Sequence, residues 1–134
     1  MGRYYHGDIE GKFMFGVQSS SDADFFGVEG QASYLNYYYS KEDLPKVEVG
    51  IKECEGVLGE YLKHIDHFFK EKDSYNNEQL SKYLTEKLGK GVTENNVAFN
   101  LEWYARLELG REIRDCIKEN DQCYFEAELW WFTL

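Results

Sequence analysis

Residues 40–72 read SKEDLPKVEVGIKECEGVLGEYLKHIDHFFKEK, and the apolar residues in this stretch recur at steps of three and four. That spacing places them on one face of an α-helix, as a stripe that packs against a core. Ser40 stands three residues before Asp43, which is an acidic variant of the capping box found at helix starts. The sequence therefore predicts a helix that begins after Ser40 and runs to about Lys72. Its stripe consists of Leu44, Val47, Ile51, Cys54, Leu58, Leu62, Ile65 and Phe69.

Three glycines interrupt this helical pattern, at positions 50, 56 and 59. A glycine inside a helix costs about 1 kcal/mol relative to alanine, because its backbone has more freedom to lose. We therefore expect either a neighbouring backbone packed closely against these glycines or a break in the helix near Gly50.

Two further helices follow in the sequence. A helix over 77–88 carries leucines and a tyrosine on one side and stops at Gly89. Thr93 has the side chain of a helix N-cap, and the apolar stripe after it predicts a third helix that runs to about Glu119.

Short aromatic and β-branched runs predict strands over residues 12–18, 33–39 and 124–132. The strands before the helices must pair with the strand after them, because no other strand is available. The predicted order is ββ-ααα-β. We expect one α+β domain over residues 1–134, in which an antiparallel or mixed sheet of about three to four strands packs on three helices.

The composition indicates a packed and strongly acidic protein. The 134 residues are 43% apolar and 17% aromatic, which is far from the composition of a disordered chain. Twenty-five acidic and 15 basic side chains give a formal charge of −10. Direct binding to nucleic acid is excluded as the main function, because such binding depends on Lys and Arg that neutralise phosphates. The acidity either serves solubility or forms a face for a basic partner.

The cysteines indicate a reducing compartment. Cys54, Cys116 and Cys123 are odd in number and their spacing fits no zinc motif, so we expect three free thiols. No apolar run is long enough to span a membrane, and the first residues lack the apolar region of a secretion signal. The sequence therefore predicts a cytoplasmic protein.

One stretch has residue types that bind metals. Glu60, His64 and His67 lie at helical spacing and would share one helix face. That face points roughly 140° away from the apolar stripe, at about 100° per residue, and is a solvent face. We expect no metal there and no cofactor elsewhere.

Two acidic loop segments are the second candidate. Asp8 and Glu10, together with Asp22 and Asp24, would form a carboxylate cluster for Mg²⁺ if their loops lay at the same end of the sheet. The alternative is ordinary turn chemistry, in which such side chains bond to nearby backbone.

Aromatic residues concentrate on the predicted sheet, with Tyr34, Tyr37 and Tyr39 on one strand. Side chains alternate between the two faces of a strand, so an aromatic face would remain after the other face is covered. An exposed aromatic face marks a binding surface or a site of self-association. The alternative is a sheet covered on both faces.

The third predicted helix carries apolar residues opposite its core stripe. Trp103 and Leu107 are followed there by Arg111 and Arg114. Aromatic, leucine and arginine side chains on one stripe have the composition of a binding hot spot. The alternative is a helix buried between other elements, with its arginines paired to nearby acids.

The N-terminal stretch GRYYHGDIEGKF (2–13), with VQSS (17–20) and DFFG (24–27), resembles small uncharacterised acidic proteins of bacterial viruses. The likeness extends through LGREIRD (109–115) and covers most of the chain, but it carries no motif with an assigned role. The resemblance implies a viral accessory protein. By analogy, small acidic proteins of this origin inhibit host defence systems, as anti-CRISPR proteins do.

The leading hypothesis is a viral accessory protein without enzymatic activity that acts in the cytoplasm of the host cell. It would bind a host protein through the basic surface of that protein and block its nucleic-acid site. A homodimer would use the same aromatic surface. Two alternatives remain. In the first, the Asp8/Glu10 loop binds a small nucleotide signal or forms the site of a metal-dependent hydrolase. In the second, the protein is a structural component of the virus particle.

Overall fold

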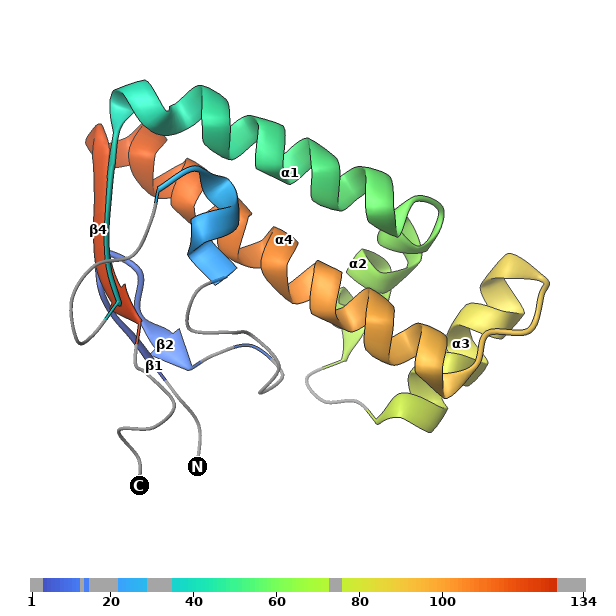
Figure 1. The fold of residues 1–134 in the computed structure, drawn as a ribbon. Helices are drawn as coiled ribbons and strands as arrows, with labels where there is room; N and C mark the ends of the chain where they lie inside the picture. The colour runs from blue at the N-terminus through green and yellow to red at the C-terminus, as the bar shows by residue number, and fades with distance from the viewer. Residues whose placement is uncertain (1–3, 13, 15–21, 29–34, 73–75, 128–134) are drawn as a thin grey trace.

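The chain folds as an α+β domain in which helices cover one face of a small sheet (Figure 1). The structure, a computed structural model, describes residues 4–12, 14, 22–28, 35–72 and 76–127. In this part of the chain no helix has the length and apolar character needed to cross a bilayer.

The sheet is antiparallel throughout, with strand order β2-β1-β4-β3. The strands are β1 (Tyr4–Gly7), β2 (Gly11–Lys12), β3 (Leu35–Ser40) and β4 (Gln122–Ala127). The central strand β4 pairs with β1 on one side and with β3 on the other, so both ends of the chain meet in the sheet. Because β2 is only two residues long, the sheet has three full strands and a short fourth one among the described residues.

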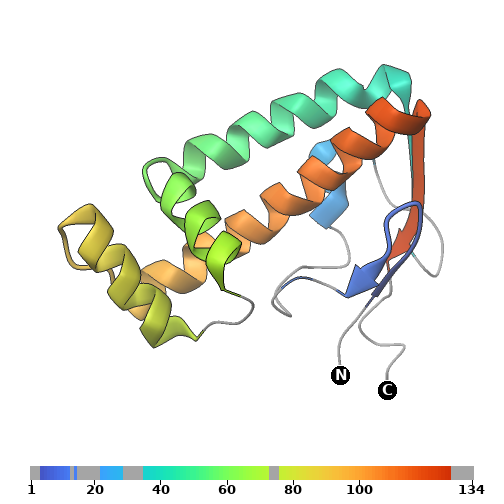
Figure 2. The ribbon, with the colours of Figure 1, turned by 180° about the vertical axis from the view of Figure 1, so that it is seen from behind.

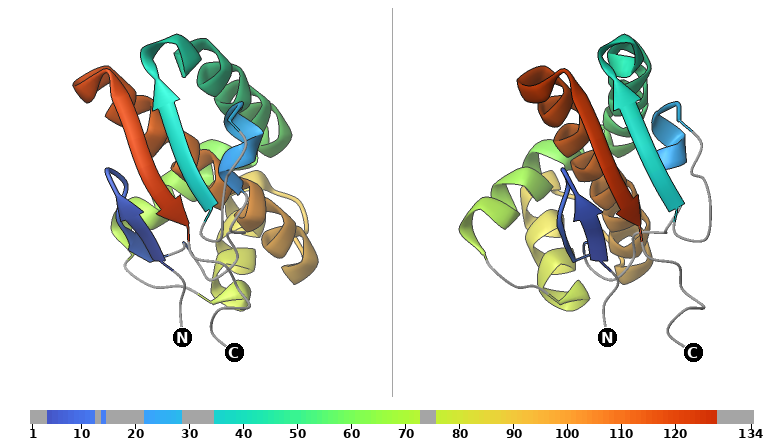
Figure 3. Two further views of the ribbon diagram at one scale, coloured as in Figure 1. Left: turned by 60° about the vertical axis from the view of Figure 1, so that its left-hand side comes forward. Right: turned by 90° about the vertical axis from the view of Figure 1, so that its left-hand side faces the viewer.

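Helix α4 (Glu94–Asn120) is the axis of the molecule. It packs along α1 (Leu44–Leu58), and its C-terminal half reaches the sheet. Helix α2 (Tyr61–Glu71) packs on α3 (Asn77–Leu88), which lies against the end of α4 far from the sheet (Figure 2). Figure 3 shows that the helices all lie behind the sheet, so its outer face is not covered by any described element.

The predicted helix over 40–72 is two helices, so the prediction of one continuous helix is wrong. The break lies at Gly59, where φ is +53°, and not near Gly50, where one of the two alternatives placed it. Gly59 ends α1 by donating its N–H to the carbonyl of Glu55 at 2.9 Å. Glycine adopts positive φ without a steric penalty, so the chain turns there and α2 begins at Tyr61.

Close packing explains why Gly50 does not break the helix. A short 3₁₀ helix (Asp22–Phe26) inserts the fully buried ring of Phe26 between α1 and α4. A Cβ at Gly50 would lie 2.6 Å from this ring, and one at Gly110 of α4 would lie 2.5 Å from it. The sequence predicted a neighbouring backbone packed against these glycines, but the close neighbour of Gly50 is the Phe26 side chain.

The other two helices begin as the sequence predicts. Thr93 caps α4 by accepting a hydrogen bond from the N–H of Asn96 at 3.1 Å. Asn76 caps α3 in the same way, through the N–H of Gln79 at 2.7 Å. At the start of the first helical segment, the Asp43 carboxylate accepts the N–H of Ser40 at 2.9 Å, which is half of the predicted capping box.

The strand prediction is correct in part. Strands β3 and β4 include every described residue of the predicted runs 33–39 and 124–132; residues 33–34 and 128–132 lie outside the described residues. Strand β1 was missed, and only Lys12 of the predicted strand 12–18 belongs to β2. Residues 13 and 15–18 lie outside the described part. The α+β class and the antiparallel sheet are confirmed, and the observed order is βββ-αααα-β.

Candidate functional site

The tyrosines predicted to form a binding surface are in the core. Tyr37 and Tyr39 are fully buried, and both rings stack on Phe125 of β4. The Tyr39 hydroxyl donates to the carbonyl of Ala23 at 2.7 Å. The prediction that Tyr37 and Tyr39 contact a partner is therefore wrong. Tyr34 lies outside the described residues.

The exposed aromatic residues on the sheet are their neighbours. Tyr38 is 52% exposed, and Tyr124 and Tyr4 are 40% and 44% exposed. All three point away from the helices, because successive side chains of a strand alternate between its faces. An aromatic outer face was predicted, but from tyrosines that belong to the inner face.

The stripe on the third predicted helix, now α4, is mostly covered. Leu107 is fully buried, and Trp103 packs against Phe25 with ring centroids 5.7 Å apart. The guanidinium of Arg106 lies 4.5 Å above the Trp103 ring and 5.4 Å from the Phe25 ring. Leu107 is therefore a core residue and not an interface residue. The alternative of a helix buried between other elements is correct for this part of α4.

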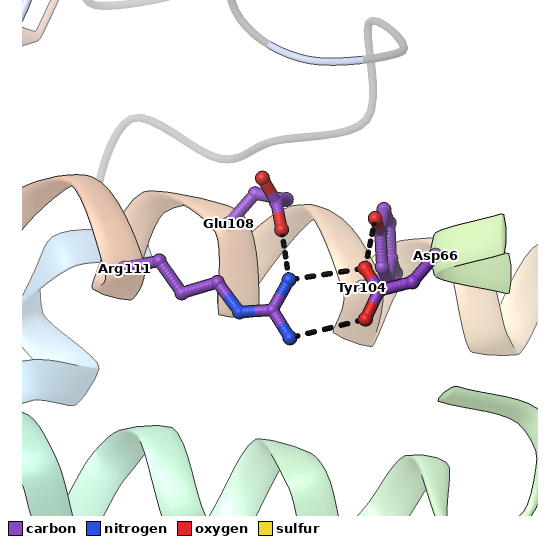
Figure 4. A network of polar contacts seen from close by, with 4 residues as sticks. All are labelled: Asp66, Tyr104, Glu108 and Arg111. Atoms are coloured by element: carbon purple, nitrogen blue, oxygen red, sulfur yellow. Dashed lines mark hydrogen bonds and ion pairs between the residues drawn. The ribbon is translucent and has the colours of Figure 1, made fainter. Parts of the chain in front are cut away.

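The arginines of that stripe are paired, which the same alternative expected. Figure 4 shows that Arg111 donates hydrogen bonds to the Asp66 carboxylate of α2 through Nη1 and Nη2, at 3.1 and 3.3 Å. Arg111 also contacts Glu108, and the Tyr104 hydroxyl donates to Asp66 at 2.6 Å. Arg114 pairs with its neighbour Asp115 at 2.9 Å.

This network fixes α2 on α4. Desolvation favours neutral Asp66, but hydrogen bonds from Arg111 and Tyr104 outweigh it and lower the pKa of Asp66 below its ordinary value. A cavity of about 470 Å³ opens beside the network, also lined by Met14, Phe69 and Lys70. The side chains in the network bind one another, so its main effect is to hold the two helices together.

The four acidic residues of the two loops do not form the carboxylate cluster that one of the two alternatives required. Asp22 is buried and pairs with Arg106 at 3.3 Å, while Asp24 accepts a hydrogen bond from Tyr37. Asp8 and Glu10 lie in the turn between β1 and β2, beside the C-terminal part of α4. The composition of two loops that are far apart in the sequence does not indicate whether they lie close together in the fold.

The histidine stretch lies on the solvent face as predicted. Glu60 binds Lys90 at 2.6 Å, and His67 lies 3.0 Å from Glu71. His64 is half-buried on α2. Among the described residues no three His, Cys, Asp or Glu side chains converge on a position that would hold a metal ion.

Asp8 and Glu10 instead help to form an acidic groove between the β1–β2 turn and α4. The groove has a volume of about 340 Å³, and five carboxylates line it. We use the name acidic groove for the side chains Asp8, Glu10, Glu112, Asp115 and Glu119.

Both walls of the acidic groove are held in place. Asp8 donates its N–H to the carbonyl of Tyr124 at 2.7 Å and accepts the N–H of Tyr124 on its carboxylate at 2.9 Å. The turn is thereby fixed to the central strand. On α4 the three acidic residues are three and four positions apart, which places them on one helix face.

Little positive charge balances the acidic groove. Asp115 pairs with Arg114, whereas Glu10, Glu112 and Glu119 form no ion pair with any described residue. Desolvation and the neighbouring Glu108 raise the pKa of Glu112 to about 6. A raised carboxyl pKa means that burial and Glu108 disfavour the charged form of Glu112, and a cationic group bound beside it would stabilise that form.

We expect Glu112→Gln to stabilise the fold at pH 7 and to lose this effect in acid. The folded state holds a proton on Glu112 up to about pH 6, whereas the ordinary pKa of a glutamate side chain is 4.5. Stability from this group is therefore present below pH 4.5 and is lost as the pH rises through about 6. The gain at pH 7 should stay below about 1 kcal/mol, because solvent screens an open groove.

Urea unfolding at pH 4, 5, 6 and 7 measures this effect. Glu102→Gln, at an exposed position on α4, is the control for removing one negative charge from an acidic protein. If both variants change stability equally at every pH, burial and Glu108 do not raise the pKa of Glu112 in the folded protein.

The three cysteines are buried free thiols, and none is placed to react readily. Desolvation raises the pKa of Cys54 to about 11. Desolvation and a hydrogen bond with Cys116 raise the pKa of Cys123 still further. Cys116 lines the floor of the acidic groove, where it adds an apolar contact.

The acidic face of α4 was missed in the sequence. Glu108, Glu112, Asp115 and Glu119 recur at steps of four, three and four, which is the same helical period that identified the apolar stripes. The acidic face of α4 could therefore be predicted from the sequence. What the sequence could not show is that Asp8 and Glu10, about 100 residues earlier, complete the opposite wall.

Comparison of the chain with protein-family models, with curated proteins and with solved structures finds no match, so its function must be inferred from the described residues.

Proposed function

We propose that this chain is a binding protein that inhibits its partner by covering a basic, nucleic-acid-binding surface with the acidic groove. In the setting that the viral resemblance implies, the partner is a host defence protein and the chain is an accessory protein of a bacterial virus. The observation that carries the proposal is the row of carboxylates in the acidic groove, which α4 and the β1–β2 turn hold in place.

The geometry of the row supports this proposal. Glu119 lies seven residues after Glu112 on α4, so the row of Glu112, Asp115 and Glu119 is about 10 Å long at the helical rise. A surface that binds nucleic acid presents Lys and Arg to a line of negative charges. A rigid line of carboxylates offers such a surface a competing set of charges.

The charge of the whole molecule supports fast capture. A formal charge of −10 attracts a basic partner over distance and orients the approach. Charge complementarity of this kind acts mostly on the association rate and on its dependence on salt. The complex should therefore form rapidly at low ionic strength and more slowly as salt is added.

The test compares two triple variants with the same net charge. Glu112→Gln/Asp115→Asn/Glu119→Gln neutralises the α4 side of the acidic groove. Glu48→Gln/Glu86→Gln/Glu102→Gln removes the same charge from exposed positions that do not line the groove. A partner is first captured from bacterial lysate on the wild-type chain, and its association rate is then measured with each variant.

We expect the groove variant to associate about 10- to 100-fold more slowly, because local charge steers the encounter. The association rate of Glu48→Gln/Glu86→Gln/Glu102→Gln should fall much less. Double-stranded DNA should compete with the wild-type chain for the captured partner. Equal losses in the two variants, or no competition by DNA, would contradict the proposal.

A further inference from the structure

The outer face of the sheet is a second surface whose chemistry is unusual for open solvent. Figure 3, right, shows this face with β3 and β4 in front of the helices. Tyr4, Tyr38 and Tyr124 lie on it, each at least 40% exposed. Three half-exposed aromatic rings on one sheet face are more apolar surface than a sheet needs to present to water. We call these three residues the tyrosine face.

A carboxylate lies beside one ring of the tyrosine face. Tyr38 and Tyr124 are directly opposite each other in the β3–β4 pairing. Glu126 lies two residues beyond Tyr124 on the same face and accepts a hydrogen bond from the Tyr124 hydroxyl at 3.0 Å. The Tyr38 hydroxyl donates to Gln122 at 3.1 Å. These bonds tie the hydroxyl ends of both rings to neighbouring side chains on β4.

The tyrosine face adjoins the acidic groove. Asp8 lines the groove, and its backbone N–H and its carboxylate both bind the backbone of Tyr124. One partner segment that lies in the acidic groove would therefore reach Tyr124 by passing Asp8. The carboxylates of Asp8 and Glu126 both bond to Tyr124 along this path.

We propose that the tyrosine face binds an arginine-rich segment of the basic partner, with guanidinium groups stacked on the tyrosine rings and paired to Glu126. This inference rests on the proposed function and names the chemistry of the partner. Charge complementarity selects the occupant: rings beside carboxylates on a protein of charge −10 attract a cation.

Arginine fits this surface better than lysine. The guanidinium is planar, stacks on aromatic faces and pairs with a carboxylate through two N–H groups, whereas the lysine ammonium is a hydrated point charge. Tyrosine rings also stack with bases, but a single-stranded nucleic acid would bring phosphates next to Glu126 and Asp8. The observed charges favour the peptide.

The experiment measures the dissociation constants of a labelled nine-arginine peptide and a nine-lysine peptide by fluorescence anisotropy. Tyr38→Leu/Tyr124→Leu removes both rings and keeps apolar side chains, and Tyr38→Phe/Tyr124→Phe keeps the rings. Phe99→Leu is the control, because Phe99 is 53% exposed in the first turns of α4, a helix end that packs on α3. Circular dichroism verifies the fold of each variant.

We expect the leucine pair to weaken arginine-peptide binding by about tenfold, which corresponds to two exposed cation–π contacts. Lysine-peptide binding should change less, and the phenylalanine pair and Phe99→Leu should bind the arginine peptide like the wild type. Equal losses for both peptides would overturn the inference, and so would a thymidine 12-mer that binds more tightly than the arginine peptide.

The two proposals fail separately in this experiment. If the groove variant Glu112→Gln/Asp115→Asn/Glu119→Gln weakens peptide binding and the leucine pair does not, the acidic groove is the only binding surface and the inference on the tyrosine face is wrong. If the leucine pair weakens binding and the groove variant does not, the inference holds and the proposed role of the acidic groove is wrong.

Discussion

Replacing Gly110 with alanine is expected to destabilise the fold by about 2 kcal/mol or more. The new methyl group would lie 2.5 Å from Phe26 Cε1, 2.7 Å from Phe26 Cζ and 3.2 Å from Ile51 Cγ1. The Phe26 ring cannot move away, because it is fully buried and Gly50 of α1 lies close to it as well. The clash therefore outweighs the gain of about 1 kcal/mol in helix propensity that alanine brings.

Gly56→Ala is the matched control, because it is the same substitution inside a helix. No atom lies within 4 Å of a Cβ at Gly56, and the residue is exposed on α1. It should therefore stabilise the protein by up to about 1 kcal/mol. Urea unfolding measured by circular dichroism gives both values. If the two variants shift stability in the same direction, Phe26 is not wedged between α1 and α4.

The difference between these glycines shows what a single sequence can and cannot predict. The helical period identified α3, α4 and the start of α1, because apolar steps of three and four have one simple cause. The same pattern contained Gly50, Gly56 and Gly59, which have a buried contact, open space and a helix end, respectively. Only the position of the neighbouring element distinguishes them.

In the candidate site, too, the local pattern could be predicted from the sequence and the neighbouring element could not. The α4 side of the acidic groove is a local pattern, and the period of its carboxylates could be read directly. The other side comes from Asp8 and Glu10, whose place depends on the pairing of β1 with β4 across most of the chain. Strand β1 has four residues, too few to show an alternating pattern. The sequence therefore pointed to Asp8 and Glu10 correctly, but grouped them with Asp22 and Asp24 and not with the acidic face of α4.

The three consecutive tyrosines of β3 show most clearly what the sequence alone cannot predict. Three consecutive tyrosines, Tyr37, Tyr38 and Tyr39, give no alternation of apolar and polar residues, so the sequence does not show which of them point inward. The structure buries Tyr37 and Tyr39 against Phe125 and leaves Tyr38 about half exposed. Desolvation and the bond to Asp24 also raise the pKa of Tyr37 far above its usual range, so its hydroxyl stays a donor.

Tyr37→Ala should therefore destabilise the fold by about 3–5 kcal/mol, the usual cost of removing a large buried ring. Tyr38→Ala removes the same side chain one position away and should cost less than about 1 kcal/mol, because that ring is 52% exposed. Chemical denaturation of both variants measures the difference, with unchanged dependence on denaturant concentration as the sign that the unfolded state is the same. A partner that loses affinity for Tyr38→Ala, while that variant stays folded, would bind the outer face. If the costs were reversed, β3 would pair with β4 one residue out of register, and Tyr38 rather than Tyr37 would be the core residue.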